Sequence, residues 1–382
     1  MTITSPIEPD VFPWYDPRGF TFSLALRHGA DVWCSGHSGS SLDPATGRPD
    51  VAGGMAEQAG VAYAKQAAVL AAAGLDFSHV TRVVENVTVA GLPHYAEAEA
   101  VRRELFGAHR PVVVTVVVDR LVRRKALIEV EVHATADPPS DRPAEVRVEH
   151  GGTVLLPSLT PVDADGAVVA PGDPAGQYRY CLEEAARLLD GIGLDLGSLV
   201  SAVEFLSPEA QRAAADLDRV RCDLPGPVFP AGTRVHTQAQ LRPGVLVSLE
   251  ATASRHPATL VDPRGLADPT MGRSPAVRAG GLLFLSGLAA PPGVPDLRGQ
   301  AETLYGRLLH TMQAVGAGPE HLLSTVEFVA ADALADYREV AEVRRALLKE
   351  PYPVSTGIVC TGTAYSGALL DVAAVAAIPE GA

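Results

Sequence analysis

The stretch FPAGTRVHTQ, residues 229–238, places Arg234 and His236 two positions apart in a predicted strand. Successive side chains of a strand point to opposite faces, so these two side chains share one face. A guanidinium binds a carboxylate through paired hydrogen bonds, and an imidazole exchanges protons near neutral pH. The pair predicts a site for a carboxylate-bearing molecule beside a proton-transfer group. The alternative is a solvated strand face on which Arg234 pairs with a surface carboxylate.

A second stretch, near residue 130, carries acidic groups on a predicted strand. Glu129, Glu131 and His133 occupy alternate positions, so their side chains share one face. Thr115, on the preceding predicted strand, is expected on the same side. This face is rich in carboxylates and has no obvious cation.

The charge of the chain limits its partners. The formal net charge of −14 argues against nucleic acids and anionic membranes. The basic residues are mostly arginines, with lysine only at Lys65, Lys125 and Lys349. Lys65 falls in a helical pattern, Lys125 near a hairpin tip and Lys349 at a helix end, so Schiff-base chemistry has no good candidate.

Cofactor and targeting signals are missing from the sequence. The four cysteines are scattered without a C-x-x-C pair, and we expect reduced thiols that are buried rather than metal-bound. With no H-E-x-x-H motif or Cys/His cluster, we predict neither a metal nor another cofactor. No apolar run approaches the roughly 18 residues that span a bilayer. The acidic, proline-rich start differs from a secretory signal, so we expect a cytoplasmic protein.

An internal repeat predicts the architecture. Aligning Glu85 with Glu204 and Glu327 gives offsets of 119 and 242 residues. The same offsets, without a gap, align further positions: Gly74, Gly193 and Gly316; Arg102, Arg221 and Arg344; and Pro111, Pro230 and Pro353. One register that holds over this length predicts three copies of a single unit.

Each copy predicts the same series of elements. A strand and a loop rich in Pro, Asp and Gly come first, followed by an Ala/Leu-rich helix that ends at the aligned glycine. The strand with the aligned glutamate, a helix with the aligned arginine and a closing β-hairpin complete the copy. Two helices against one sheet form an α+β sandwich. We predict units at 18–136, 144–254 and 270–378, separated by Pro-rich linkers.

The repeated glutamate and arginine allow two interpretations. The strand glutamate of each unit can pair with the helix arginine of the same unit, which we favour. Alternatively, Glu85, Glu204 and Glu327 form a ring of carboxylates around a pseudo-threefold axis, able to bind a cation or water.

The repeated pattern resembles the RidA (YjgF) family. SGHSGSSLDPATGRPDVAGG is similar to the strand–loop signature of that family, and FGAHRPVVVTVVVDRLVRRKALIEVEVHA to its closing hairpin. The third unit matches in RSPAVRAGGLLFLSG and PYPVSTGIVCTGTAYSGALLDVAAVAA. Family members are usually homotrimers with ligand clefts between subunits. The resemblance implies three fused, chorismate-mutase-like α/β sandwich units that form a single-chain pseudo-trimer, either monomeric or as a further homodimer.

The resemblance also implies where the chemistry lies. The family has a carboxylate-binding arginine two residues after the aligned proline, a small residue or thiol two further on, a glutamate on the next strand and a tyrosine near the start. The arginine positions are Val113, Gly232 and Ser355, so all three units lack it. The small residue or thiol of the family corresponds to Thr115, Arg234 and Gly357. The glutamate corresponds to Glu129, Ser248 and Asp371. The tyrosine corresponds to Phe22, residue 144 and Arg273.

These positions give the candidate site residues. We expect residue 113 to face residue 129 across a hairpin, and Gly232 to face Ser248, with Glu250 on the same face as Arg234. His37 follows the first strand, where the family places backbone groups of the cleft. The predicted catalytic residues are Glu129, His236, Glu250 and Asp371. The predicted substrate-binding residues are Arg234, Arg273, Thr115, Ser248, Ser355 and His37.

Three functions compete on this basis. The resemblance implies an enzyme that hydrolyses imines or enamines, or performs a related proton transfer, on a small carboxylate-bearing metabolite, with one of three clefts active. The missing arginine favours a non-catalytic binder or regulator of small molecules. GRSPAVRAGGLLFLSG also loosely resembles a segment of the chorismatases, which suggests a chorismatase-like lyase or hydrolase.

Overall fold

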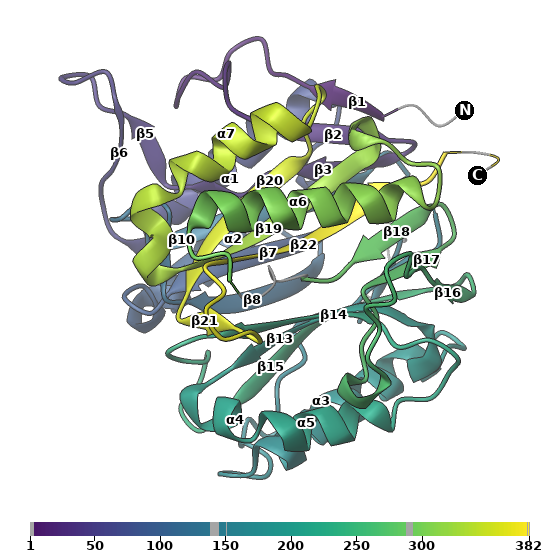
Figure 1. Ribbon diagram of the computed structural model, residues 1–382. Helices are drawn as coiled ribbons and strands as arrows, with labels where there is room; N and C mark the ends of the chain where they lie inside the picture. Colours follow the sequence, from purple (N-terminus) through teal and green to yellow (C-terminus); the bar gives the residue numbers. More distant parts are fainter. Residues whose placement is uncertain (1–3, 138–144, 150, 288–292, 380, 382) are drawn as a thin grey trace.

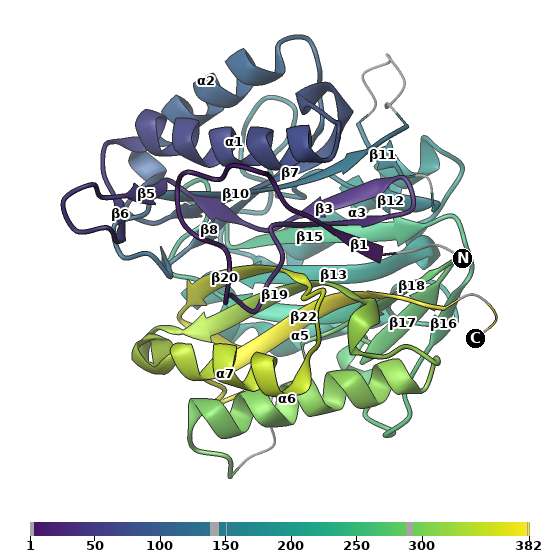
Figure 2. The same ribbon diagram turned by 90° about the horizontal axis from the view of Figure 1, so that it is seen from above.

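The protein has a mixed α/β fold in which β-sheets face one another and helices cover their outer sides. The computed structural model describes residues 4–137, 145–149, 151–287, 293–379 and 381, and residue 144 lies outside them. In Figure 2, α1 (Met55–Ala72) and α2 (Tyr95–Phe106) lie along one outer edge, and α6 (Leu297–Gln313) and α7 (Arg338–Leu347) along the opposite edge. No helix of the described part is long and apolar enough to cross a membrane.

The first sheet has the strand order β1-β2-β3-β10-β7-β8, and β4 also pairs with β10. Helices α1 and α2 cover its outer face. Its strands are β1 (Thr4–Ile7), β2 (Ala25–His28), β3 (Asp31–Cys34), β4 (His37–Ser38), β7 (Val80–Thr88), β8 (Val112–Val118) and β10 (Ile128–Thr135). Between them lie a small sheet of β5 (Ser40–Leu42) and β6 (Pro49–Val51), and the 3₁₀ turns η1 (Phe77–His79) and η2 (Leu92–His94).

The second sheet has the order β11-β12-β15-β13-β14-β21, with its helices on the outer side in Figure 1. Its strands are β11 (Arg147–Val148), β12 (Thr153–Leu155), β13 (Leu199–Leu206), β14 (Ala231–His236), β15 (Val247–Ser254) and β21 (Gly362–Thr363). Its helices are α3 (Pro174–Asp190), η3 (Leu196–Ser198), α4 (Pro208–Arg212) and α5 (Ala214–Cys222).

The third sheet has the order β16-β17-β18-β22-β19-β20-β9. Its strands are β16 (Ala258–Leu260), β17 (Ala276–Ala279), β18 (Leu282–Leu285), β19 (Leu322–Ala330), β20 (Val354–Cys360), β22 (Leu370–Ala377) and β9 (Arg120–Leu121). The turns η4 (Pro269–Met271), η5 (Pro319–His321) and η6 (Ala331–Asp336) complete this part, together with α6 and α7.

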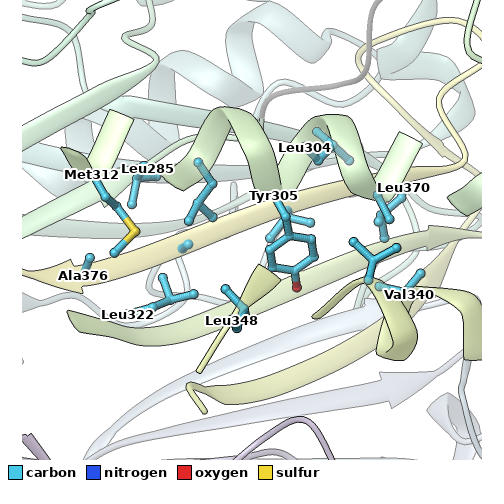
Figure 3. Close-up of a cluster of buried hydrophobic side chains, with 14 of the residues drawn as sticks. Leu285, Leu304, Tyr305, Met312, Leu322, Val340, Leu348, Leu370 and Ala376 are labelled. Atoms are coloured by element: carbon cyan, nitrogen blue, oxygen red, sulfur yellow. The ribbon is translucent and has the colours of Figure 1, made fainter. Parts of the chain in front are cut away.

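Two kinds of apolar core hold these layers together. Figure 3 shows the outer core of the third sheet, where Met312 of α6 lies near Leu285 of β18, and Leu304 of α6 lies near Leu370 of β22. A separate core joins the inner faces of all three sheets, and in it the rings of Phe205 and Phe328 lie 6.5 Å apart.

The helix ends agree with the sequence. Gly74, Gly193 and Gly316 follow the first long helix of each copy and have φ angles of 72°, 77° and 70°. This left-handed conformation favours glycine and ends the helix, as predicted.

The closing β-hairpin predicted for each copy is wrong. β8 pairs in parallel with β7, and β10 pairs with the other edge of β7, so β7 lies between them. Val113 and Glu129 therefore do not face each other across a hairpin, and in the second sheet β13 similarly separates Gly232 from Ser248. The reason is the helix between β7 and β8, which returns the chain so that the two strands run parallel.

The repeated glutamates and arginines pair within their own sheets, which confirms the first of the two interpretations. Each glutamate lies on the helix-facing side of a central strand, so the predicted carboxylate ring around an axis is wrong. The pairs are Glu85 with Arg102, Glu204 with Arg221 and Glu327 with Arg344.

Two tyrosines complete this network in the first and third sheets. Tyr63 and Tyr95 donate hydrogen bonds to Glu85, and Tyr305 and Tyr337 donate to Glu327. In the repeat register, position 95 corresponds to 214 and 337.

The second sheet has Ala214 at that position, and Arg234 replaces the missing hydroxyl. The Nε of Arg234 donates to Oε2 of Glu204 at 2.7 Å, and its NH2 group donates to Asp218 at 2.8 Å. Although burial opposes ionisation, Arg221 and Arg234 lower the pKa of Glu204 to about 2. Arg234 is thus a structural partner of a buried carboxylate.

We expect Arg234→Thr to lower the free energy of unfolding by about 3–5 kcal/mol, because it leaves the buried charges of Glu204 and Asp218 short of a partner. Adding Ala214→Tyr recreates the tyrosine–threonine pair of Tyr95 and Thr115, whose hydroxyls lie 2.7 Å apart. The double variant should therefore recover most of the loss. Urea denaturation of the three proteins measures this, and equal stability of wild type and Arg234→Thr would contradict it.

Candidate functional site

The strands β8, β14 and β20 lie at or next to one end of their sheets, and at or just before each of them the chain contacts residues from another part of the sequence. We name the contacts after that strand: the β8 junction, the β14 junction and the β20 junction. At the β20 junction, the amide of Ser23 donates to the carbonyl of Pro353 at 3.0 Å, and the amide of Ser355 donates to the Ser35 hydroxyl at 2.9 Å. The β20 junction therefore combines residues of the first and third predicted units, as expected for a cleft between units.

Glu129 lies at the β20 junction, opposite the edge strand that carries Ser355. A Cβ atom on Gly36 would lie 2.6 Å from Oε1 of Glu129 and 2.8 Å from the hydroxyl oxygen of Thr356. The carboxyl of Glu129 and the hydroxyl of Thr356 thus lie against the backbone of Gly36, where a Cβ atom would clash with both. Glu129 is half-buried, and none of the described hydrogen bonds involves its carboxyl group.

Opposing influences determine the pKa of the Glu129 carboxyl group. Burial and the neighbouring Glu131 raise the pKa of Glu129 to about 8, although Lys65 and Arg123 act in the opposite direction. A carboxyl group with such a pKa exchanges its proton near neutral pH, as an acid–base catalyst must.

Lys65 is a fully buried lysine close to this carboxyl group. Its Nζ donates to the carbonyl of Ser38 at 2.7 Å and to the hydroxyl of Ser40 at 3.2 Å, and it lies 5.5 Å from the ring centre of Tyr15. Ser38 is the β-sheet partner of Glu129. Burial lowers the pKa of Lys65 to about 7, against the attraction of Glu129.

His37 and Tyr15 form the adjoining wall. The Tyr15 hydroxyl lies 3.3 Å from Nδ1 of His37, whose Nε2 is buried without a hydrogen-bond partner in the described structure. Burial lowers the pKa of His37 to about 3, so the ring is neutral and offers a hydrogen bond rather than a charge. This position suits the predicted binding role of His37.

A cavity of about 460 Å³ lies at the same junction, between the N-terminal segment and the loop that leads into β20. Its lining includes Phe20, Phe22, Ser23, Pro351 and Tyr352. Phe22 is the residue predicted at the tyrosine position of the family, and Ser23 also contacts β20. The β20 junction therefore has a cavity on the side of the N-terminal segment, while the half-buried Glu129 lies at the same junction outside the lining of that cavity.

The β14 junction holds the arginine and the aspartate of the third copy. A Cβ on Gly232 would lie 2.8 Å from the Cβ of Arg273, so the side chain of Arg273 crosses the strand where the family has its arginine. The NH2 group of Arg273 donates to the Tyr365 hydroxyl at 2.9 Å. Burial raises the pKa of Asp371 to about 7, opposed by Arg273, but the side chain lies against Gly287 and is only 1% exposed.

His236 lies at the end of β14, where its backbone pairs with Gly362 of β21. Burial, followed by the charge of Arg234, lowers the pKa of His236 to about 4. The imidazole is therefore neutral at physiological pH, and Arg234 beside it is already bound to Glu204.

The β8 junction is closed. The amide of Thr115 donates to the Ser158 hydroxyl at 2.7 Å, and the Ser248 hydroxyl donates to Oε1 of Gln240 at 2.8 Å. The remaining pocket has a volume of about 20 Å³. Thr115 and Ser248 do meet there, as neighbours from two different copies.

Glu250 does not share a face with Arg234, and that expectation is wrong. Glu250 faces the space between the sheets, where it pairs with Arg82 of β7. Arg234 lies on the opposite, helix-facing side of the second sheet. The expectation assumed that β14 and β15 pair directly as a hairpin. Instead β13 lies between them, so Glu250 and Arg234 point to opposite faces of the sheet.

Tyr15 and Lys65 were missed by the sequence reasoning. Tyr15 precedes the predicted first unit, and Lys65 falls within a helix. A signal for Lys65 was available: it lies among residues of α1 that are buried, such as Ala62, Gln66 and Val69, where a lysine is unexpected. Among the residues that the structure describes, no cluster of His, Cys, Asp and Glu suits a metal ion.

Comparisons with solved structures find similar folds. A putative endoribonuclease from Thermotoga maritima is 26% identical over 34% of this chain and 96% of that chain, with a TM-score of 0.30. E. coli TdcF with bound serine is 22% identical over 34% of this chain and 98% of that chain, with a TM-score of 0.29. A chorismatase is 14% identical over 79% of this chain and 94% of that chain, with a TM-score of 0.49.

The family comparison concerns the first copy of the repeat. A search among curated proteins gives no match. The sequence model of the family described as endoribonuclease L-PSP matches residues 19–136, the part of the chain that carries His37, Lys65 and Glu129. The predicted resemblance is thereby confirmed for this part: residues 19–136 match the model of the endoribonuclease L-PSP (RidA/YjgF) family.

Proposed function

We propose that the protein is a RidA-like enzyme that hydrolyses an imine or enamine of a small carboxylate-bearing metabolite at the β20 junction. The observation that carries this proposal is Glu129: a half-buried carboxyl group with a raised pKa, without a hydrogen-bond partner among the described residues, at the junction between the first sheet and β20. A carboxyl group held in this state is available to a substrate and a water molecule.

The chemistry requires one group that accepts and returns a proton. Water attacks the imine carbon while Glu129 takes a proton from it, and the electron pair of the C=N bond moves to nitrogen, which takes a proton from solvent. In the second step Glu129 returns its proton to nitrogen. The C–N bond then breaks, the hydroxyl proton leaves to solvent, and a keto acid and ammonia are released.

The other two junctions suit this reaction less well. Asp371 has a raised pKa, but its carboxyl group is almost fully buried against Gly287. The β8 junction has Ser248 in place of the acid, and that hydroxyl is bound to Gln240. We therefore propose one active junction and two inactive ones.

We further propose that the three sheets and their helices are three units, at 18–136, 144–254 and 270–378, that form a single-chain pseudo-trimer. The shared arrangement of central strands, the three glutamate–arginine pairs and the contacts at the three junctions support this. The matched family is described as an endoribonuclease, but the net charge of −14 argues against RNA as the substrate. The metabolite is then the partner, and no nucleic acid or membrane is needed.

A non-catalytic binder is the second candidate, and the lost strand arginine favours it, since Ser355 holds that position at the β20 junction. Assays of imine hydrolysis and of 2-oxo acid binding decide between the enzyme and the binder. A binder would bind 2-oxo acids without accelerating imine hydrolysis over buffer. In that case chorismate would be the next compound to test for turnover.

Glu129→Gln should abolish the acceleration of keto-acid release, because an amide of the same shape cannot accept the proton of the attacking water. Imines are generated by an amino-acid oxidase, and semicarbazide competes for them as a trap. Asp371→Asn serves as the matched control, since it makes the same change at the β14 junction, and should retain activity. Loss of activity in the control alone would instead assign the reaction to the β14 junction.

We expect the rate of the wild-type enzyme to rise with pH through about 8, because Glu129 must be deprotonated to accept a proton and its pKa is raised to about 8. Lys65 lowers this pKa, so Lys65→Met should shift the rise to higher pH. The kcat/KM profile between pH 6 and 10 measures both. A rise that stays at the same pH in Lys65→Met would show that Glu129 is not the titrating group.

A further inference from the structure

The β20 junction lacks a cation on its edge strand, although its proposed substrate carries a carboxylate. Ser355 stands where the family has arginine. The nearby Arg344 is occupied, since its guanidinium donates to Thr21 at 3.0 Å, to Glu327 at 3.1 Å and to the Ser355 hydroxyl at 3.1 Å. The positive charge for a substrate must therefore come from another element.

Lys65 is poorly placed to supply that charge directly. Its amine is 0% exposed and is held by Ser38 and Ser40 below the ring of Tyr15. Burial also lowers the pKa of Lys65 to about 7, so part of the population is uncharged near neutral pH. Lys65 can adjust the proton affinity of Glu129, but it does not reach a ligand in the cavity.

The loop between β9 and β10 brings another arginine to the junction. β9 pairs with β20, with Leu121 opposite Ile358, so the loop starts directly on the edge strand. The side chain of Val122 lies 3.3 Å from the position that a Cβ on Gly357 would take. Arg123 is the next residue, and its carbonyl accepts a hydrogen bond from the amide of Ala126, which closes the turn.

The far end of this loop is also fixed. The side chain of Gln58 donates to the carbonyl of Lys125 at 3.3 Å and accepts from the amide of Leu127 at 2.8 Å. The amine of Lys125 pairs with Asp50 at 2.8 Å. The loop is therefore anchored at both ends, and the position of Arg123 relative to Glu129 is defined by the fold.

Arg123 is the basic residue of this loop that acts electrostatically on groups of the β20 junction. It is exposed, and none of the described hydrogen bonds or ion pairs involves its guanidinium. Its charge acts on Tyr15, Lys65 and Glu129, which belong to three different elements, whereas the adjacent Arg124 acts on none of them. Because charge interactions weaken with distance, Arg123 is better placed than Arg124 to act on a ligand beside Glu129.

We propose that the guanidinium of Arg123 binds the carboxylate of the substrate at the β20 junction, in place of the strand arginine that this junction lacks. This inference rests on the function proposed above, because it takes the β20 junction as the ligand site. A planar guanidinium can hold a carboxylate through two parallel hydrogen bonds. With the carboxylate at Arg123, the adjacent imine carbon lies toward Glu129.

Arg123→Ala tests the proposal, with Arg124→Ala as the matched control, since Arg124 is an exposed arginine of the same loop with no role assigned to it. We expect the KM for amino-acid-derived imines to rise about tenfold to a hundredfold in Arg123→Ala, with little change in kcat. Arg123→Lys should recover only part of this loss, and Arg124→Ala should behave as wild type. For an imine without a carboxylate, wild type and Arg123→Ala should not differ.

Calorimetric binding of 2-oxobutanoate to the same proteins separates the two proposals. If wild type accelerates hydrolysis and Arg123→Ala equals Arg124→Ala in KM and in binding, the inference about Arg123 is wrong and the proposed function stands. If wild type binds the keto acid through Arg123 without turnover, the inference stands and the proposed function fails. If wild type neither turns over imines nor binds the keto acid, both are wrong.

Discussion

The structure depends on the need of each edge strand for hydrogen-bond partners. An uncovered edge exposes backbone N–H and C=O groups, and here these groups are met by segments from another part of the chain. β9 extends the third sheet beyond β20, β21 extends the second sheet beyond β14, and Ser158 binds the carbonyl of Val113 on β8. The same contacts form the junctions, so the constraint that joins the sheets also creates the sites.

The carboxylate-binding arginine that the family resemblance predicts is absent at Val113, Gly232 and Ser355, and other basic residues lie near the last two of these positions. Arg234 lies two positions beyond the lost site and turns to the helix side, where it replaces a tyrosine as the partner of Glu204. At the β14 junction, Arg273 reaches over Gly232 from the opposite side. The β20 junction retains the acid, Glu129, together with Lys65 below it and Arg123 beside it. Separate copies in one chain are able to diverge in this way, whereas identical subunits are not.

The sequence was sufficient for the buried glutamate–arginine pairs and for the glycines that follow the first long helices, because these depend on spacing within one predicted unit. The same offsets also relate Gln58, Gln177 and Gln300, which each accept a hydrogen bond from the amide of an aligned leucine at 2.7–2.8 Å. Strand order was not available from spacing. Two neighbouring apolar strands in sequence suggested a hairpin, and only the position of β7 between them shows otherwise.

The contacts at the junctions could not be predicted from the sequence either. At the β20 junction, for example, Ser35 and Ser355 are in contact although more than 200 residues separate them in the chain. Arg234 illustrates the same limit. Its type and its place on a strand suggested a ligand site, but Ala214, on a different element, decides what it binds. Local residue type predicts what a side chain can do, and the contacts of distant segments determine what it does.

The central claim is that a carboxylate-bearing ligand binds at the β20 junction rather than at the β14 junction. A crystal structure of the protein soaked with a 2-oxo acid tests this most directly. The account predicts ligand density next to Glu129 at the β20 junction, with the ligand carboxylate at Arg123 and the two other junctions empty. Density at Arg273 and Asp371 of the β14 junction, with the β20 junction empty, would contradict it.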